Sequence, residues 1–101
     1  MKQAPKIKSY LGFCIKAGKA VFGVDNIVKI KRGLYLIIQD KELGNASKRK
    51  LRNYVVSNNV ELLELDIKQI LAKENCKAVG LKEKNLANAI IREIKEIKQY
   101  E

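Results

Sequence analysis

Leu34-Tyr35-Leu36-Ile37-Ile38 is an uninterrupted apolar run of five residues, and no apolar run in the chain is longer. Gly33 precedes it, and the polar pair Gln39-Asp40 follows it. A continuous run of this length between turn residues is typical of a strand that is buried on both faces. Such a strand needs helices on both sides, so the run predicts an α/β layer sandwich.

The residues before this strand predict two helices and one very short strand. Pro5 suits the first turn of a helix, and Gly18 can end that helix in a left-handed cap. Residues 20–22 form the short strand, and the second helix follows Gly23 and is expected to stop at Gly33. The apolar stripes of these helices contain Ile7, Tyr10, Leu11 and Cys14, and then Val24, Ile27 and Val28.

The residues after the strand repeat the alternation. Asn45 or Ser47 is expected to cap a basic helix, and residues 60–65 contain a strand. Asp66 and Gln69 resemble a capping box that opens a short helix, residues 77–81 form another strand, and a long helix ends the chain. The apolar stripes of the three helices contain Leu51, Tyr54 and Val55, then Ile67, Ile70 and Leu71, and finally Leu86, Ala87, Ile90, Ile91, Ile94 and Ile97.

Length and composition restrict the classes of protein to consider. The 101 residues contain one proline and no linker-like tract, so residues 1–101 are expected to form a single domain. The absence of histidine excludes imidazole acid–base chemistry and histidine metal ligands. No apolar run approaches the length of a membrane span, and no secretory apolar region follows Lys2, which favours a cytoplasmic protein. Cys14 and Cys76 form no CxxC pair and are interpreted as small buried residues.

Net charge is the strongest functional signal. The chain has 21 Lys and Arg against 11 Asp and Glu, a net charge of +10. Residues 1–58 hold 13 of the basic residues and three acids, whereas residues 59–101 hold eight of each. This asymmetry favours one face built for a polyanion such as a nucleic acid, with a generally basic surface as the simpler alternative.

Residues 18–29 carry the most informative motif, Gly-Lys-Ala-Val-Phe-Gly-Val-Asp-Asn-Ile-Val-Lys. Gly23 allows backbone amides to approach an anion where a helix begins. Asp25 and Asn26 offer acceptors and an amide donor for base edges, and Lys29 lies one helical turn further on, within reach of a phosphate. On spacing alone, the simpler interpretation is preferred, in which Asp25 and Asn26 are residues that favour a helix start.

This motif resembles the signature of the kink-turn RNA-binding ribosomal protein family, which includes archaeal L-seven-Ae and bacterial YlxQ-type proteins. The family pattern is Gly-Lys, three residues, and then Gly-x-Asn-Glu-x-x-Lys, followed by a basic turn and a buried strand. Gly18, Lys19, Gly23 and Lys29 match its offsets. The resemblance implies a three-layer α-β-α sandwich around a small mixed four-stranded sheet. It also implies binding to sharply bent RNA with tandem sheared G·A pairs.

The chain departs from the family pattern at two positions, with Asp25 where the family has Asn and Asn26 where it has Glu. The resemblance also implies RNA contacts from the loop before the last strand, here Glu74, Asn75 and Cys76. The full set of expected RNA-binding residues is Lys16, Lys19, Gly23, Asp25, Asn26, Lys29, Lys31, Arg32, Glu74, Asn75 and Cys76.

Two further groups are weaker candidates. The basic run Lys48, Arg49, Lys50 and Arg52 is either a set of phosphate contacts or a solvated helix face. The tyrosines at positions 10, 35 and 54 have the chemistry for base stacking, but their spacing favours burial.

The sequence therefore predicts a non-catalytic, cytoplasmic, monomeric protein that binds structured RNA, ribosomal or otherwise, without a cofactor or a metal. An enzyme is disfavoured because the chain has neither histidine nor a phosphate-binding GxxxxGK[ST] loop. The alternative is a protein-interaction module on the same fold with weak, nonspecific RNA binding.

Overall fold

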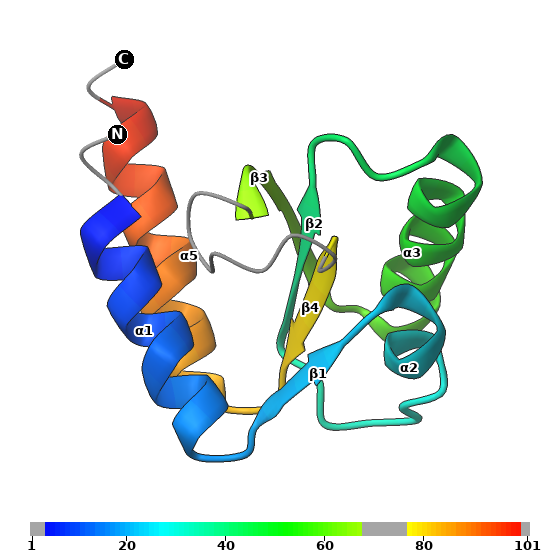
Figure 1. The fold of residues 1–101 in the computed structure, drawn as a ribbon, viewed down its shortest axis with the longest axis horizontal. Helices are drawn as coiled ribbons and strands as arrows, with labels where there is room; N and C mark the ends of the chain where they lie inside the picture. The colour runs from blue at the N-terminus through cyan, green and yellow to red at the C-terminus, as the bar shows by residue number, and fades with distance from the viewer. Residues whose placement is uncertain (1–3, 68–76, 100–101) are drawn as a thin grey trace.

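The computed structural model describes residues 4–67 and 77–99. Helices and strands alternate along the chain in the predicted manner (Figure 1). The elements are α1 (Ala4–Lys16), β1 (Ala20–Phe22), α2 (Val24–Val28), β2 (Leu36–Asp40), α3 (Asn45–Asn58), β3 (Glu61–Leu65), β4 (Ala78–Leu81) and α5 (Lys84–Gln99).

The four strands form one mixed sheet in the order β1-β4-β2-β3. β4 is antiparallel to both of its neighbours, whereas β2 and β3 are parallel, with Leu36 opposite Glu61 and Asp40 opposite Leu65. A parallel pair needs a crossover connection, and α3 supplies it. The expected small mixed sheet is confirmed.

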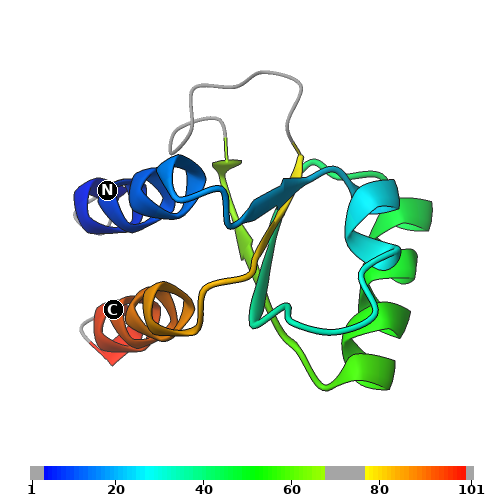
Figure 2. The same ribbon diagram turned by 90° about the horizontal axis from the view of Figure 1, so that it is seen from below.

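Two helix layers cover the sheet. Figure 2 shows α1 and α5 on one face and α2 and α3 on the other. Successive side chains of β2 point to opposite faces, so Leu36 and Ile38 pack under α1 and α5 while Ile37 packs under α2 and α3. All five residues of β2 are buried, which explains why its sequence shows no apolar–polar alternation. The three-layer α-β-α sandwich is confirmed.

The end of α1 follows the predicted cap. Gly18 has a φ of +70°, and its amide donates to the Ile15 carbonyl at 3.0 Å. The Lys19 amide donates to the Cys14 carbonyl at 2.9 Å. These two bonds form a Schellman motif, which satisfies carbonyls that the helix leaves without a partner.

Several predicted boundaries and burial states are wrong. The central strand begins at Leu36, two residues later than predicted. Tyr35 is 43% exposed, contrary to the burial predicted for it, whereas Leu34 is buried although it too lies outside the strand. α2 ends at Val28, well before Gly33, and Gly44 rather than Asn45 or Ser47 is the N-cap of α3. The strands predicted within 20–22, 60–65 and 77–81 and the long last helix are confirmed, whereas most of the helix predicted after Asp66 lies outside the described residues.

Asp40, at the end of β2, is 2% exposed and joins three segments of the chain. Its carboxyl group accepts hydrogen bonds from the Glu42 amide at 2.9 Å and from the Ile67 amide at 2.8 Å. Its backbone amide donates to the Lys77 carbonyl at 2.8 Å. Asp40 therefore holds the chain after β2, the chain after β3 and the start of β4 together.

We expect Asp40→Ala to lower the free energy of unfolding by about 1–3 kcal/mol, because the buried Ile67 amide loses its acceptor. Urea unfolding measures this, with Glu61→Ala on the exposed face of β3 as the matched control. Equal effects from the two variants would contradict the role assigned to Asp40.

Candidate nucleic-acid interface

Gly23 connects β1 directly to α2 and has a φ of +92°, a conformation that favours glycine. Its amide donates to the Ala78 carbonyl at 3.0 Å, and its carbonyl accepts from the Ile27 amide at 3.0 Å. β4 therefore uses the amide of Gly23 itself, and the predicted approach of the amides at the start of α2 to an anion stays a prediction. The same bond places the start of α2 beside the first residue of β4.

Asn26 and Asp25 lie on the first turn of α2 and are exposed. The Asn26 amide nitrogen donates to the Phe22 carbonyl at 2.9 Å, which holds its side chain back over Gly23. The Asp25 side chain is 82% exposed, and its Oδ1 lies 3.7 Å from the Lys50 Nζ on α3. Asn26 is thus locally anchored, while Asp25 links α2 to α3.

The predicted RNA-binding residues fall into separate places. Gly23, Asp25, Asn26 and Lys29 lie together on or beside α2. Lys16 and Lys19 lie at the opposite end of β1, about 10 Å away along three strand residues, where the Lys82 amide donates to the Lys19 carbonyl at 2.8 Å (Figure 1).

The remaining predicted residues lie elsewhere in the chain. Lys31 and Arg32 are exposed in the segment between α2 and β2. Glu74, Asn75 and Cys76 lie outside the described residues. Lys77 follows them in the chain and directly precedes β4. The first residue of β4, Ala78, accepts the hydrogen bond from the Gly23 amide.

The basic half of the sequence does not lie on a single face of the molecule (Figure 2). α1 belongs to the basic half but lies on the opposite side of the sheet from α3. Residues 23–33 and 44–58, which form the α2–α3 side, hold seven Lys and Arg against a single acid, Asp25. Residues 4–19 and 82–99, on the α1–α5 side, hold nine against three glutamates.

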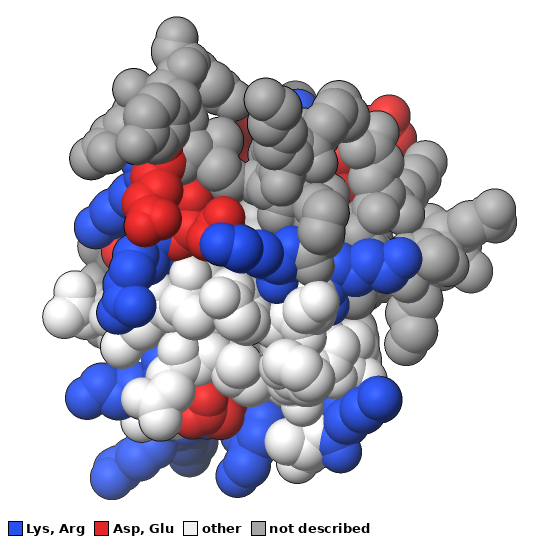
Figure 3. All heavy atoms as spheres, turned by 90° about the vertical axis from the view of Figure 1, so that its left-hand side faces the viewer, with Lys and Arg blue, Asp and Glu red and all other residues white. Residues whose placement is uncertain are grey.

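The two sides therefore differ in how their charges are mixed. Figure 3 shows basic and acidic side chains next to one another on the α1–α5 side, where Lys6 Nζ lies 3.9 Å from Glu93 Oε1. The α2–α3 side reaches the same net charge of +6 over fewer residues and with one acid. Its positive potential is the less interrupted of the two.

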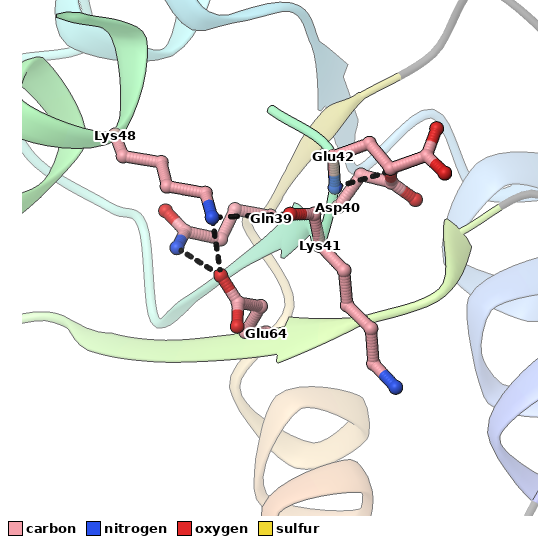
Figure 4. Close-up of polar contacts among 6 residues, drawn as sticks. All are labelled: Gln39, Asp40, Lys41, Glu42, Lys48 and Glu64. Carbon is pink, nitrogen blue, oxygen red and sulfur yellow. Dashed lines mark hydrogen bonds and ion pairs between the residues drawn. The ribbon is translucent and has the colours of Figure 1, made fainter. Parts of the chain in front are cut away.

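Lys48, in the basic run on α3, makes contacts within the protein (Figure 4). The Lys48 Nζ lies 3.0 Å from Glu64 Oε2 on β3 and also donates to the Lys41 carbonyl at 3.0 Å. Gln39, which is 8% exposed, donates to the same Glu64 oxygen at 3.1 Å. Lys48 therefore ties α3 to the sheet, whereas Arg49, Lys50 and Arg52 are exposed.

The hydrogen bonds from Lys48 and Gln39 lower the pKa of Glu64 below its ordinary value. A lowered carboxyl pKa contributes stability above the ordinary carboxyl pKa, and this contribution is lost as the pH falls through the lower pKa of the folded state. We expect Lys48→Met to raise the pKa of Glu64 towards its ordinary value, as measured by NMR titration. Arg49→Met is the control, and an unchanged Glu64 pKa in Lys48→Met would contradict the assignment.

A groove of about 360 Å³ lies between α2 and α3. Its lining residues are Val28, Lys50, Asn53, Tyr54, Ser57 and Asn58.

Tyr54 is buried, as its spacing predicts, and its hydroxyl donates to the Ile30 carbonyl at 2.6 Å. Burial raises the pKa of that hydroxyl. Sequence reasoning missed Asn53, Ser57 and Asn58, because polar residues on a helix give no signal until a second helix lies beside them.

Other candidate chemistry is limited among residues 4–67 and 77–99. Cys14 is buried as expected, its thiol donates to the Lys19 carbonyl at 3.4 Å, and burial raises its pKa. This part of the chain contains no group of three or more Cys, Asp or Glu residues able to hold a metal ion. No helix in these ranges combines the length and the apolar character that a membrane span requires.

Comparison with known proteins shows the fold. No protein-family model matches the chain, and no curated protein matches it significantly. Among the solved structures, 43 chains match. One is a protein of unknown function from Bacillus halodurans C, which has a TM-score of 0.81 and 18% sequence identity over 91% of this chain and 98% of its own. At this identity the likeness establishes a shared three-layer α-β-α fold.

Proposed function

We propose that the protein is a non-catalytic, cytoplasmic RNA-binding protein, ribosomal or ribosome-associated, that stabilises sharply bent RNA through its α2–α3 side. The observation that carries this proposal is the charge of that side, seven Lys and Arg against one Asp. Lys48 is paired with Glu64 and Lys50 with Asp25, so the five other basic residues, all exposed, supply the positive surface that would attract the phosphate backbone and give most of the affinity. The resemblance of residues 18–29 to the kink-turn family supports bent RNA as the target.

The residues on and beside α2 have two proposed roles: some position the RNA backbone and others recognise its bases. Lys29 is exposed and directly follows α2, where its ammonium can contact a phosphate. Asn26 is oriented by its bond to Phe22, which presents the rest of its amide to a base edge at little entropic cost. Lys31, Arg32, Arg49 and Arg52 add exposed charge around them.

The salt dependence of binding separates this proposal from a protein-interaction module. We expect retention of a kink-turn RNA to fall steeply with salt, with each phosphate contact adding about 0.7–0.9 to the log–log slope. Lys29→Ala should weaken binding to all RNAs about equally and lower the slope by about one.

Lys95→Ala, an exposed lysine on α5, is the control for that measurement. Because α5 lies on the other face of the sheet, this variant should leave both affinity and slope unchanged. Equal effects from Lys29→Ala and Lys95→Ala would contradict an interface on the α2–α3 side. Binding that ignores salt would favour a protein partner.

Asp25 gives a second test. The carboxylate repels phosphates, cannot donate to a base acceptor, and lies 3.7 Å from Lys50. We therefore expect Asp25→Asn to tighten binding to a kink-turn RNA, and to tighten binding to a plain duplex less, because the amide adds a donor and releases Lys50.

The stability of the Asp25→Asn variant should change by no more than a few tenths of a kcal/mol, since exposed ion pairs contribute little. Titration of both proteins against one kink-turn RNA at fixed salt measures the difference. Weaker binding by Asp25→Asn would mean that the carboxylate itself accepts from a base, and that the target differs from the RNA of the family.

A further inference from the structure

We propose that the groove between α2 and α3 binds single-stranded RNA and extends the interface proposed above beyond the bent duplex. This inference rests on the proposed function, but it concerns different residues. The groove has a volume of about 360 Å³, within the range of about 300–1,000 Å³ common for ligand sites.

The groove presents a polar stripe against an apolar wall. Lys50, Asn53 and Ser57 follow one another at spacings of three and four residues, so they share one face of α3. Val28 of α2 forms the opposite wall. Tyr54 is buried in the lining, and its hydrogen bond to the Ile30 carbonyl ties α3 to the segment that follows α2.

The functional groups of this stripe match a nucleotide. Asn53 and Ser57 are exposed and have no hydrogen-bond partner among the described residues, so their amide and hydroxyl groups are available to base edges and to the ribose 2′-hydroxyl. The Lys50 ammonium suits a phosphate, and the half-buried Val28 suits the face of a base. No carboxylate is among the lining residues, although the Asp25 carboxylate lies 3.7 Å from the Lys50 Nζ.

The groove is continuous with the proposed interface. Lys50 lies in its lining and also 3.7 Å from Asp25, on the first turn of α2. Lys29 directly follows Val28 in the chain. A strand of RNA leaving the residues on α2 therefore meets the stripe of α3 beside the Asp25–Lys50 pair, where Asp25 is an exposed carboxylate.

A randomised hexaribonucleotide is the probe that tests this inference, with binding followed by NMR on the whole chain. We expect the amide resonances of Asn53 and Ser57 to shift during the titration, and those of Asn85 and Asn88 on α5 to stay in place. The double variant Asn53→Ala/Ser57→Ala should bind the hexamer about tenfold more weakly, because two hydrogen-bonding groups are lost.

Asn85→Ala/Asn88→Ala is the matched control and should bind the hexamer within about twofold of the unmodified protein, because both residues are exposed on the other face. Alanine is the better helix former, so both double variants should fold, which thermal unfolding checks. Unshifted α3 resonances, or hexamer binding by Asn53→Ala/Ser57→Ala at the original affinity, would overturn the inference.

A kink-turn hairpin without a single-stranded extension separates this test from that of the proposed function. Binding to this hairpin should depend on Lys29 and stay within about twofold in Asn53→Ala/Ser57→Ala. If the hairpin does not bind while the hexamer occupies the groove, the proposed function fails and the groove remains an RNA site. If the hairpin binds and the hexamer does not, only the groove inference fails.

Discussion

Burial of β2 on both faces is the constraint on which the rest of the structure depends. Its five residues are all buried, so each face of the sheet must be covered by helices. Its last two residues are polar, and a polar group buried without a partner costs free energy. Both side chains are hydrogen-bonded: Gln39 donates to Glu64, and Asp40 accepts from the Glu42 and Ile67 amides.

The same packing sets the position of the candidate interface. Gly80 on β4 has no side chain, and a Cβ there would lie 3.1 Å from the Leu34 Cδ2 and 3.4 Å from the Ile27 Cγ1. This glycine lets α2 and the segment before β2 approach the sheet closely. The bond from the Gly23 amide to the Ala78 carbonyl then fixes where α2 begins, and with it the directions of Asp25, Asn26 and Lys29.

Packing also decides which basic residues remain available to a partner. Lys48 is bonded to Glu64 and to the Lys41 carbonyl, so it stabilises the contact between α3 and the sheet. Lys50 on α3 forms an ion pair with Asp25 on α2. The remaining positive potential of this side comes from five exposed residues, Lys29, Lys31, Arg32, Arg49 and Arg52.

The sequence by itself determined the alternation of elements, the two-sided burial of the central strand and the glycine that ends α1, because apolar periodicity and backbone freedom are local properties. It also placed Asp25 and Asn26 on one short helix, which Lys29 directly follows. Only the tertiary structure decided that the basic half of the chain lies on two opposite sides, that the Gly23 amide is used by β4, and that Asn53 and Ser57 line a groove. These features depend on which segments of the chain pack against one another in the fold. The spacing of residues along a single segment does not determine that packing.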